Sequence, residues 1–101
     1  MKIGQIVKER YEILEILGEG GMAFVYKARD MQLERFVAIK TLKPNYVNQE
    51  TFVDRFKREA KTAANLNHPN IVQIFDWGIE EEPYFVMEYI CLLYTSDAAD
   101  E

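Results

Sequence analysis

The sequence contains very little of what a disulfide or a metal site requires. Its 101 residues include one cysteine, Cys91, and one histidine, His68. A single cysteine excludes a disulfide within the chain, which fits a reducing compartment. One histidine without a cysteine cluster does not make a zinc site, so we expect no metal site built from these residues. Because His68 precedes a proline, we expect it to be a structural hydrogen-bonding residue.

Long apolar runs and an excess of positive charge are also missing. Residues 1–7 lack the apolar core of a signal peptide, and no run of 18 apolar residues occurs. We therefore expect a cytoplasmic chain without membrane contact, and a membrane span later in a longer protein stays an open alternative. The net charge is −5, which argues against nucleic acid as a partner. A chain of this length forms at most one small domain of marginal stability.

What the chain does have is a glycine-dense turn between two β-patterned runs. Residues 18–21 read Gly-Glu-Gly-Gly. The runs on either side carry strand-favouring residues, namely Tyr11, Ile13, Leu14, Ile16 and Leu17 before the turn and Phe24, Val25 and Tyr26 after it. Walker A and Rossmann turns open a helix, whereas the residues after this turn favour a strand, which argues against both motifs. We predict a hairpin tip whose backbone N–H groups approach phosphates, and a plain tight turn is the alternative.

One lysine lies in an apolar strand. Alternation over residues 35–42 places Phe36, Ala38 and Lys40 on one face and Val37 and Ile39 on the other. A lysine in such a strand either extends to solvent at an edge or is held by a partner.

The candidate partner of Lys40 is Glu59. Residues 51–66 carry apolar side chains at helical spacing (Phe52, Phe56, Ala63 and Leu66), and Glu59 falls in the middle of this stripe. Because a buried charge needs a partner, we hypothesise an ion pair that aims the Lys40 ammonium at nucleotide phosphates. The alternative for Glu59 is a partly exposed helix position without a special role.

The remaining pattern predicts the other elements. We expect a lead-in over 1–10, strands over 11–19, 23–29, 35–42, 71–79 and 84–89, and one long helix ending near Leu66. Asn48 is the predicted N-cap of that helix, with Glu50 in its first turn. We expect the acidic turn formed by residues 80–82 to be solvated.

Taken in order, these segments resemble the amino-terminal lobe of a protein kinase, and most closely that of bacterial serine/threonine kinases of the eukaryotic type. The likeness covers about residues 11–90. It rests on Gly18-x-Gly20-x-x-Ala23-x-Val25, on Val37-Ala38-Ile39-Lys40, on Glu59, on His68-Pro69-Asn70-Ile71 and on Phe85-Val86-Met87-Glu88-Tyr89. One departure is Ala23, where the family has its third glycine.

The resemblance implies an α+β lobe, a five-stranded antiparallel sheet packed by one long helix, with the second lobe missing. It also implies ATP as the cofactor. Lys40 would contact the phosphates and Glu59 would hold Lys40. The other binding residues implied are Gly18, Glu19, Gly20 and Gly21 over the phosphates, Leu17, Val25 and Ala38 around the base, Met87 as gatekeeper, and the Glu88 carbonyl and Ile90 N–H at the adenine edge.

The resemblance further implies protein substrates with Ser or Thr hydroxyls. The catalytic aspartate and the Mg²⁺ ligands belong to the second lobe, so we expect this fragment to be inactive by itself. Two alternatives stay open. One is a pseudokinase-like nucleotide-binding or scaffold module, and the other is a self-contained small binding domain.

The likeness ends after residue 90. Residues 91–101 resemble a translated sequencing adapter. We therefore expect three parts: a lead-in over 1–10, a kinase lobe over 11–90 and a non-native tail over 91–101. A natural short carboxyl tail is the rival interpretation.

Overall fold

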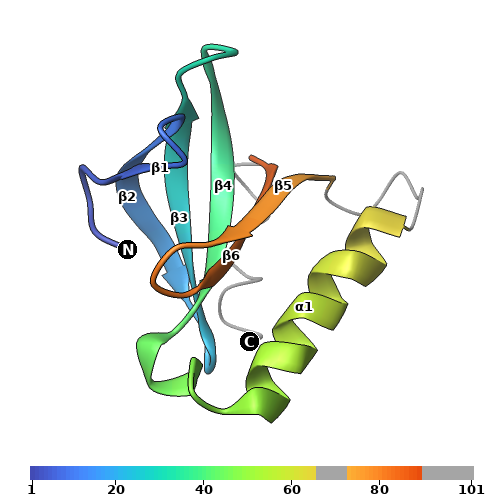
Figure 1. Cartoon of the computed structure of the whole chain (residues 1–101). Coiled ribbons are helices and arrows are strands. Elements are labelled where there is room, and N and C mark those ends of the chain that lie inside the picture. Colours follow the sequence, from blue (N-terminus) through green and yellow to red (C-terminus); the bar gives the residue numbers. More distant parts are fainter. Residues whose placement is uncertain (66–72, 90–101) are drawn as a thin grey trace.

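The structure is a computed structural model and describes residues 1–65 and 73–89. These residues form six strands and one long α-helix. In chain order these are β1 (Ile6–Val7), β2 (Tyr11–Glu19), β3 (Ala23–Asp30), β4 (Arg35–Leu42), the short 3₁₀ helix η1 (Pro44–Tyr46), α1 (Glu50–Asn65), β5 (Ile74–Ile79) and β6 (Pro83–Glu88). All strand pairs are antiparallel, in the order β1-β2-β3-β4-β6-β5. The α1 helix stands beside the sheet on the side of β5 and β6 (Figure 1). The predicted α+β class is confirmed.

The structure adds β1 to the five expected strands. Two residues of the expected lead-in pair with the start of β2, Ile6 with Glu12 and Val7 with Tyr11. Val7 is fully buried, which explains why so short a strand is held in place. At the other end of the sheet β5 begins at Ile74. The first two residues of the strand predicted over 71–79, and His68, lie outside the described residues.

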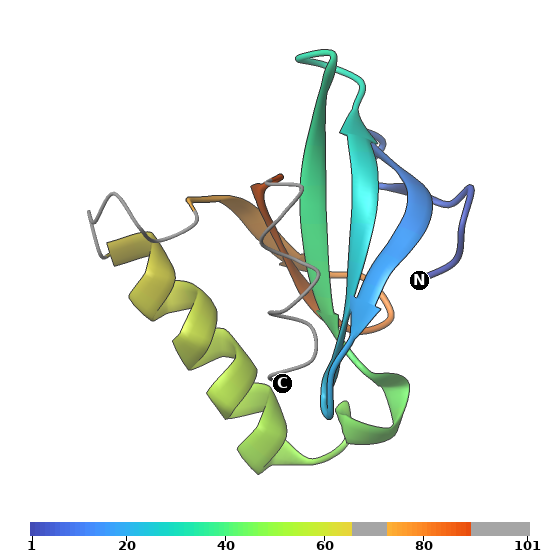
Figure 2. The same ribbon diagram turned by 180° about the vertical axis from the view of Figure 1, so that it is seen from behind.

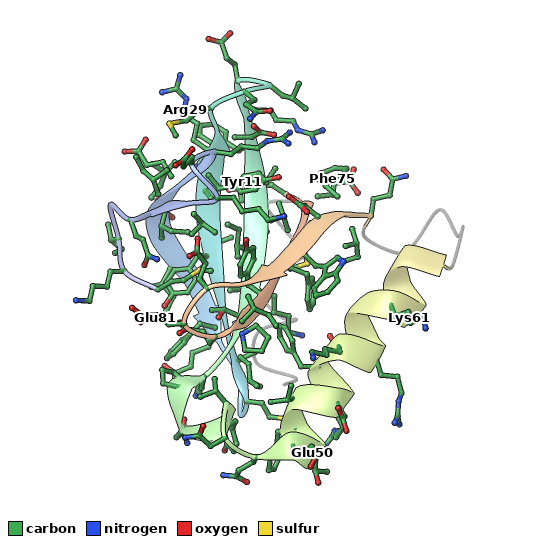
Figure 3. The ribbon with its side chains drawn as sticks, viewed as in Figure 1. Tyr11, Arg29, Glu50, Lys61, Phe75 and Glu81 are labelled. Atoms are coloured by element: carbon green, nitrogen blue, oxygen red, sulfur yellow. The ribbon has the colours of Figure 1, made fainter. Side chains whose placement is uncertain are left out.

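The sheet curls until its two ends meet. The hydroxyl of Tyr11 on β2 donates a hydrogen bond of 3.1 Å to the carboxylate of Asp76 on β5, and Lys8 Nζ lies 2.9 Å from the same carboxylate. These contacts join strands that stand far apart in the strand order. Figure 3 labels Tyr11 of β2 and Phe75 of β5 at about the same height of the molecule. The curl therefore encloses an apolar interior, which we call the inner core, of Val7, Tyr11, Ile13, Tyr26, Ala28, Val37, Ile39, Tyr84 and Val86.

The outer face of the sheet carries a second cluster, which we call the helix-side core. It contains Ala23, Val25, Ala38, Leu42, Phe56, Phe85 and Met87. Phe56 attaches α1, because its ring lies 5.0 Å from that of Phe85 on β6, centroid to centroid. Val37 and Ile39 belong to the inner core and Ala38 to the helix-side core, so the predicted alternation of β4 is confirmed.

The predicted N-cap is wrong by one residue. The N–H groups of Phe52 and Val53 donate to the carbonyl of Gln49, so Gln49 and not Asn48 opens the helix. The reason lies in η1, which Pro44 begins and which the pattern did not predict. Gln49 N–H donates to the Tyr46 carbonyl, so the turn runs one residue further before α1 starts. Glu50 lies in the first turn, as predicted.

The acidic turn is only partly solvated, contrary to expectation. Glu81 is exposed on the turn between β5 and β6 (Figure 3). Glu82 is 4% exposed, and its Oε1 lies 2.6 Å from the amino group of Met1. A buried carboxylate needs a partner, and the curl of the sheet brings the N-terminal amine to it. Within residues 1–65 and 73–89, no helix is both long and apolar enough to cross a lipid bilayer.

Candidate functional site

Lys40 lies at the centre of the candidate site. It lies on β4 between two strands, paired in register with Val25 of β3 and with Phe85 of β6. Its side chain is 7% exposed, and its Nζ lies 2.7 Å from Glu59 Oε1 of α1. The hypothesised ion pair is therefore present, and it joins the sheet to its helix.

The two members of this pair differ in their exposure to solvent. Glu59 was expected in the middle of a buried stripe, and this expectation is wrong, because its side chain is 46% exposed. Among the described side chains of α1, Phe56 is the buried one and Phe52 is half-buried, and the side chains of Ala63 and Leu66 lie outside the described set. Glu59 reaches Lys40 from the solvent-exposed edge of the contact between α1 and the sheet. An ion pair with one solvated member contributes about 1 kcal/mol or less to stability.

Apolar residues continue along the sheet from Lys40. Leu17, Val25 and Ala38, predicted to lie around the base, and Met87, the predicted gatekeeper, belong to or pack against the helix-side core. Ala38 and Met87 are register partners on β4 and β6, two residues from Lys40 and Phe85. The structure therefore places an apolar surface directly beside a partly desolvated ammonium.

Glu88 ends β6 at the far side of that surface, and its backbone N–H donates to the Gln73 carbonyl at 2.9 Å. Its side chain is exposed. The predicted partner position Ile90 lies outside the described residues.

The glycine turn is the tip of the β2–β3 hairpin, as predicted. The Gly20 N–H donates to the Ala23 carbonyl at 2.9 Å and closes the turn, and Gly18 pairs with Val25. Neither Gly18, Gly20 nor Gly21 takes a left-handed φ. The turn therefore does not need glycine for its backbone angles, and what these residues provide is a backbone without Cβ atoms.

Two lysine contacts, one at the hairpin and one on the helix side of the sheet, were not predicted. Lys43, just after β4, lies 2.6 Å from Glu19 of the hairpin. Lys27 lies opposite Ala38 in register, with its Nζ 4.4 Å from the Phe36 ring centroid and 5.3 Å from that of Tyr89. Both contacts depend on strand register, which the sequence pattern does not reveal.

A separate ion cluster lies at the other end of β2 and β3. Arg10 donates two hydrogen bonds to the fully buried Asp30, at 2.9 and 2.8 Å. The Arg10 guanidinium, together with the backbone N–H groups of Leu33 and Gln32, lowers the pKa of Asp30 to about 2. The cluster fastens a turn, so we assign it to stability.

The tyrosines of the inner core are held neutral. Burial, reinforced by the charge of Asp76, raises the pKa of Tyr11 to about 12. Burial likewise raises the pKa of Tyr84 to about 12. Burial alone would raise the pKa of Asp76, but hydrogen bonds from Lys8, Trp77 N–H and Tyr11 lower it overall. Across residues 1–65 and 73–89, no three His, Cys, Asp or Glu side chains gather to hold a metal ion.

The curled sheet, its attached helix, the glycine hairpin and the Lys40–Glu59 pair define an α+β lobe with a cationic centre beside an apolar surface. The model of the protein kinase domain family matches residues 11–94. The chain therefore belongs to the protein kinase family, as the resemblance of its motifs predicted.

Several proteins of known class are similar to the chain. It is 53% identical over 89 residues to a probable serine/threonine-protein kinase of Clostridium perfringens. This alignment covers 87% of the chain and 13% of the relative. It is 52% identical over 91 residues to the serine/threonine-protein kinase PrkC of Bacillus subtilis, covering 89% of the chain and 14% of the relative. The chain thus spans about one seventh of the length of these curated relatives.

Among solved structures, the PknI kinase domain of Mycobacterium tuberculosis superposes with a TM-score of 0.70 at 28% identity. The superposition covers 89% of the chain and 36% of that domain.

Proposed function

We propose that this chain is the ATP-binding lobe of a bacterial serine/threonine protein kinase. The observation that carries the proposal is the Lys40–Glu59 pair, 2.7 Å long, next to the apolar residues of the helix-side core. Burying an ammonium this far in a sheet costs free energy unless an anion compensates its charge. The named class of the relatives and the family match support the same assignment.

The residues fit the two halves of ATP. Leu17, Val25, Ala38 and Met87 offer an apolar surface for the adenine ring, and the carbonyl of Glu88 with the N–H of Ile90 would pair with its polar edge. The glycine turn formed by residues 18–21 would cover the phosphates with backbone N–H groups.

Lys40 is the charged residue of this assignment. Its ammonium would contact the α- and β-phosphates, and Glu59 would fix the direction of the side chain. ATP supplies the phosphoryl group that is transferred to a Ser or Thr hydroxyl of a protein substrate. The chain's contribution is position and charge.

The catalytic base and the Mg²⁺ ligands would come from a second lobe that follows residue 90. We therefore propose that the fragment does not transfer phosphate alone, and that residues 11–90 form the lobe and residues 91–101 a non-native tail. Because ATP is a cytoplasmic substrate, a cytoplasmic position of this lobe follows from the same proposal. Sequencing the gene past codon 90 tests the tail, and finding the same eleven codons in genomic DNA would contradict it.

A non-catalytic, pseudokinase-like module is the second candidate. It would still bind a nucleotide, but it would not need an ammonium held for phosphate transfer. The partly desolvated Lys40 with its carboxylate partner favours the enzyme.

The test is a titration of the ¹⁵N-labelled chain with ATP, followed through the backbone amide shifts of residues 18–25 and 38–40. We expect saturable shifts, and a loss of affinity of roughly tenfold or more in Lys40→Met, because hydrogen bonds to charged groups contribute about 1.5–3 kcal/mol. The matched control is Lys57→Met, which removes an exposed lysine of α1. Absence of saturable binding, or equal affinity in Lys40→Met and the control, would contradict the proposal.

A further inference from the structure

Lys43, the residue directly after β4, touches the glycine hairpin in three ways. Its backbone N–H donates to the Met22 carbonyl at 2.7 Å. Its Nζ lies 2.6 Å from Glu19 Oε2 and 5.1 Å from the centroid of the Phe24 ring. Only 15% of the Lys43 side chain is exposed, so this lysine packs along its length instead of extending into water.

These contacts link both strands of the hairpin to the end of β4. Glu19 is the last residue of β2, and Phe24 is its register partner on β3. The final register pair of β3 and β4 is Ala23 with Leu42, so the next residue of the chain meets the turn itself. The hairpin tip, η1 and the beginning of α1 lie at the same end of the molecule in both views (Figure 1, Figure 2).

The Lys43 side chain lies on the opposite side of the sheet from the Lys40 side chain. Phe24, over which Lys43 lies, packs against the inner core, whereas Lys40 lies among helix-side residues. The Lys43 ammonium is therefore committed to the hairpin and is not directed at the surface beside Lys40.

We propose that Lys43 is a positioning residue for the glycine hairpin. Its backbone and its ammonium together hold the tip at one height, so that the N–H groups of residues 18–21 meet phosphates over Lys40. This inference rests on the proposed function, because it concerns the position of the glycine hairpin over the phosphates of ATP. It requires that Lys43 affect ligands with phosphates and leave ligands without phosphates alone.

The size of the effect follows from the exposure of the pair. Glu19 is 57% exposed, and an ion pair of that kind changes an equilibrium by roughly threefold. We expect Lys43→Met to weaken ATP binding by roughly that factor. Adenosine, which has the base and ribose but no phosphate, should bind both proteins equally.

The experiment compares the full chain with Lys43→Met, Lys43→Arg and the control Lys8→Met. Lys8→Met removes an ion pair of similar length, 2.9 Å to Asp76, at the distant edge of the sheet. Affinities for ATP and adenosine are measured by amide-shift titration. Hydrogen exchange and ¹⁵N relaxation of Gly20, Gly21 and Met22 report hairpin motion without ligand.

The expected result is faster exchange and larger motion of the hairpin in Lys43→Met, with ATP binding weakened and adenosine binding unchanged. Lys43→Arg, which keeps the charge, should restore both, and Lys8→Met should alter neither. An unchanged hairpin in Lys43→Met, or equal losses for ATP and adenosine, would overturn the inference while leaving the proposed function intact. If the unsubstituted chain binds no ATP, the proposed function fails, and the inference fails with it.

Discussion

The two faces of the sheet hold their charges in different ways. On the inner side, Asp30 is fully buried beside Arg10, and Glu82 is 4% exposed against the amine of Met1. On the helix side, the lysine is buried and its carboxylate partner, Glu59, is 46% exposed. The inner pairs are closed by the chain's own N-terminal segment, which the curl brings against β5 and β6. The helix-side pair keeps one member in water.

Under the proposed function, this difference separates the charges that stabilise the fold from the charges that bind the nucleotide. A buried acid that loses its partner leaves an uncompensated charge, so the inner pairs are fixed parts of the fold. When an anion approaches the lysine, a solvated carboxylate partner can change its position at little cost in free energy. We infer that the inner face carries the stability of the lobe and the helix side its chemistry.

The largest expected effect is on the inner face, at Asp30. Asp30→Ala should lower the free energy of unfolding by about 4 kcal/mol, because Arg10 loses its carboxylate and the N–H groups of Gln32 and Leu33 lose their acceptor. Urea denaturation, in an osmolyte if the variant is only partly folded, measures the change. The control is Glu15→Ala, an exposed acid on β2. Equal losses in the two variants would show that the buried pair carries no special weight.

Glu82 should come next. Glu82→Ala removes the partner of the Met1 amine and should cost about 3 kcal/mol, whereas Glu81→Ala, the exposed neighbour, should cost under about 0.5 kcal/mol. Acetylating the N-terminal amine should imitate Glu82→Ala without any substitution. Thermal unfolding of the three proteins measures the effect. If the two glutamate variants melt together, the amine does not hold the turn.

Acid should weaken the inner face through Asp30. Its pKa of about 2 in the fold lies below the ordinary value of 3.8. A pKa lowered in this way adds stability that is fully present above about pH 4 and is lost as the pH falls to about 2, which amounts to about 2 kcal/mol. The stability difference between the unsubstituted chain and Asp30→Asn, measured by denaturation at several pH values, should shrink over that window. A difference independent of pH would contradict the assignment.

The smallest effect on stability belongs to the helix side. Glu59→Gln should change the free energy of unfolding by under about 1 kcal/mol, because the carboxylate is already half in water. Its ATP affinity should nevertheless fall severalfold, since Lys40 loses its direction. Denaturation and the amide titration separate these two outcomes. A large loss of stability with unchanged affinity would place Glu59 among the structural charges and reverse the comparison.

The sequence predicted what local patterns determine. The glycine hairpin followed from its turn residues and the strand-favouring residues around it, and the alternation of β4 followed from periodicity. The pairing of Lys40 with Glu59 followed from the need of a charge on an apolar strand for a partner. The curl of the sheet was not predictable in this way, because it arises from contacts between residues far apart, such as Tyr11 with Asp76.

Each missed feature depends on such a long-range or competing contact. The burial of Glu82 follows from the curl, and the contact of Lys43 with the hairpin follows from where two strands end. The exposure of Glu59 follows from where α1 touches the sheet. Asn48 was a reasonable cap by residue type, but the turn after η1 selected Gln49.

The most direct test of the central claim is a crystal structure of the chain with a non-hydrolysable ATP analogue. The account predicts Lys40 Nζ within about 3 Å of an α- or β-phosphate oxygen, with Glu59 still on the ammonium and the glycine turn above the phosphates. A bound analogue whose phosphates lie away from Lys40, with the lysine and glutamate unchanged, would contradict it.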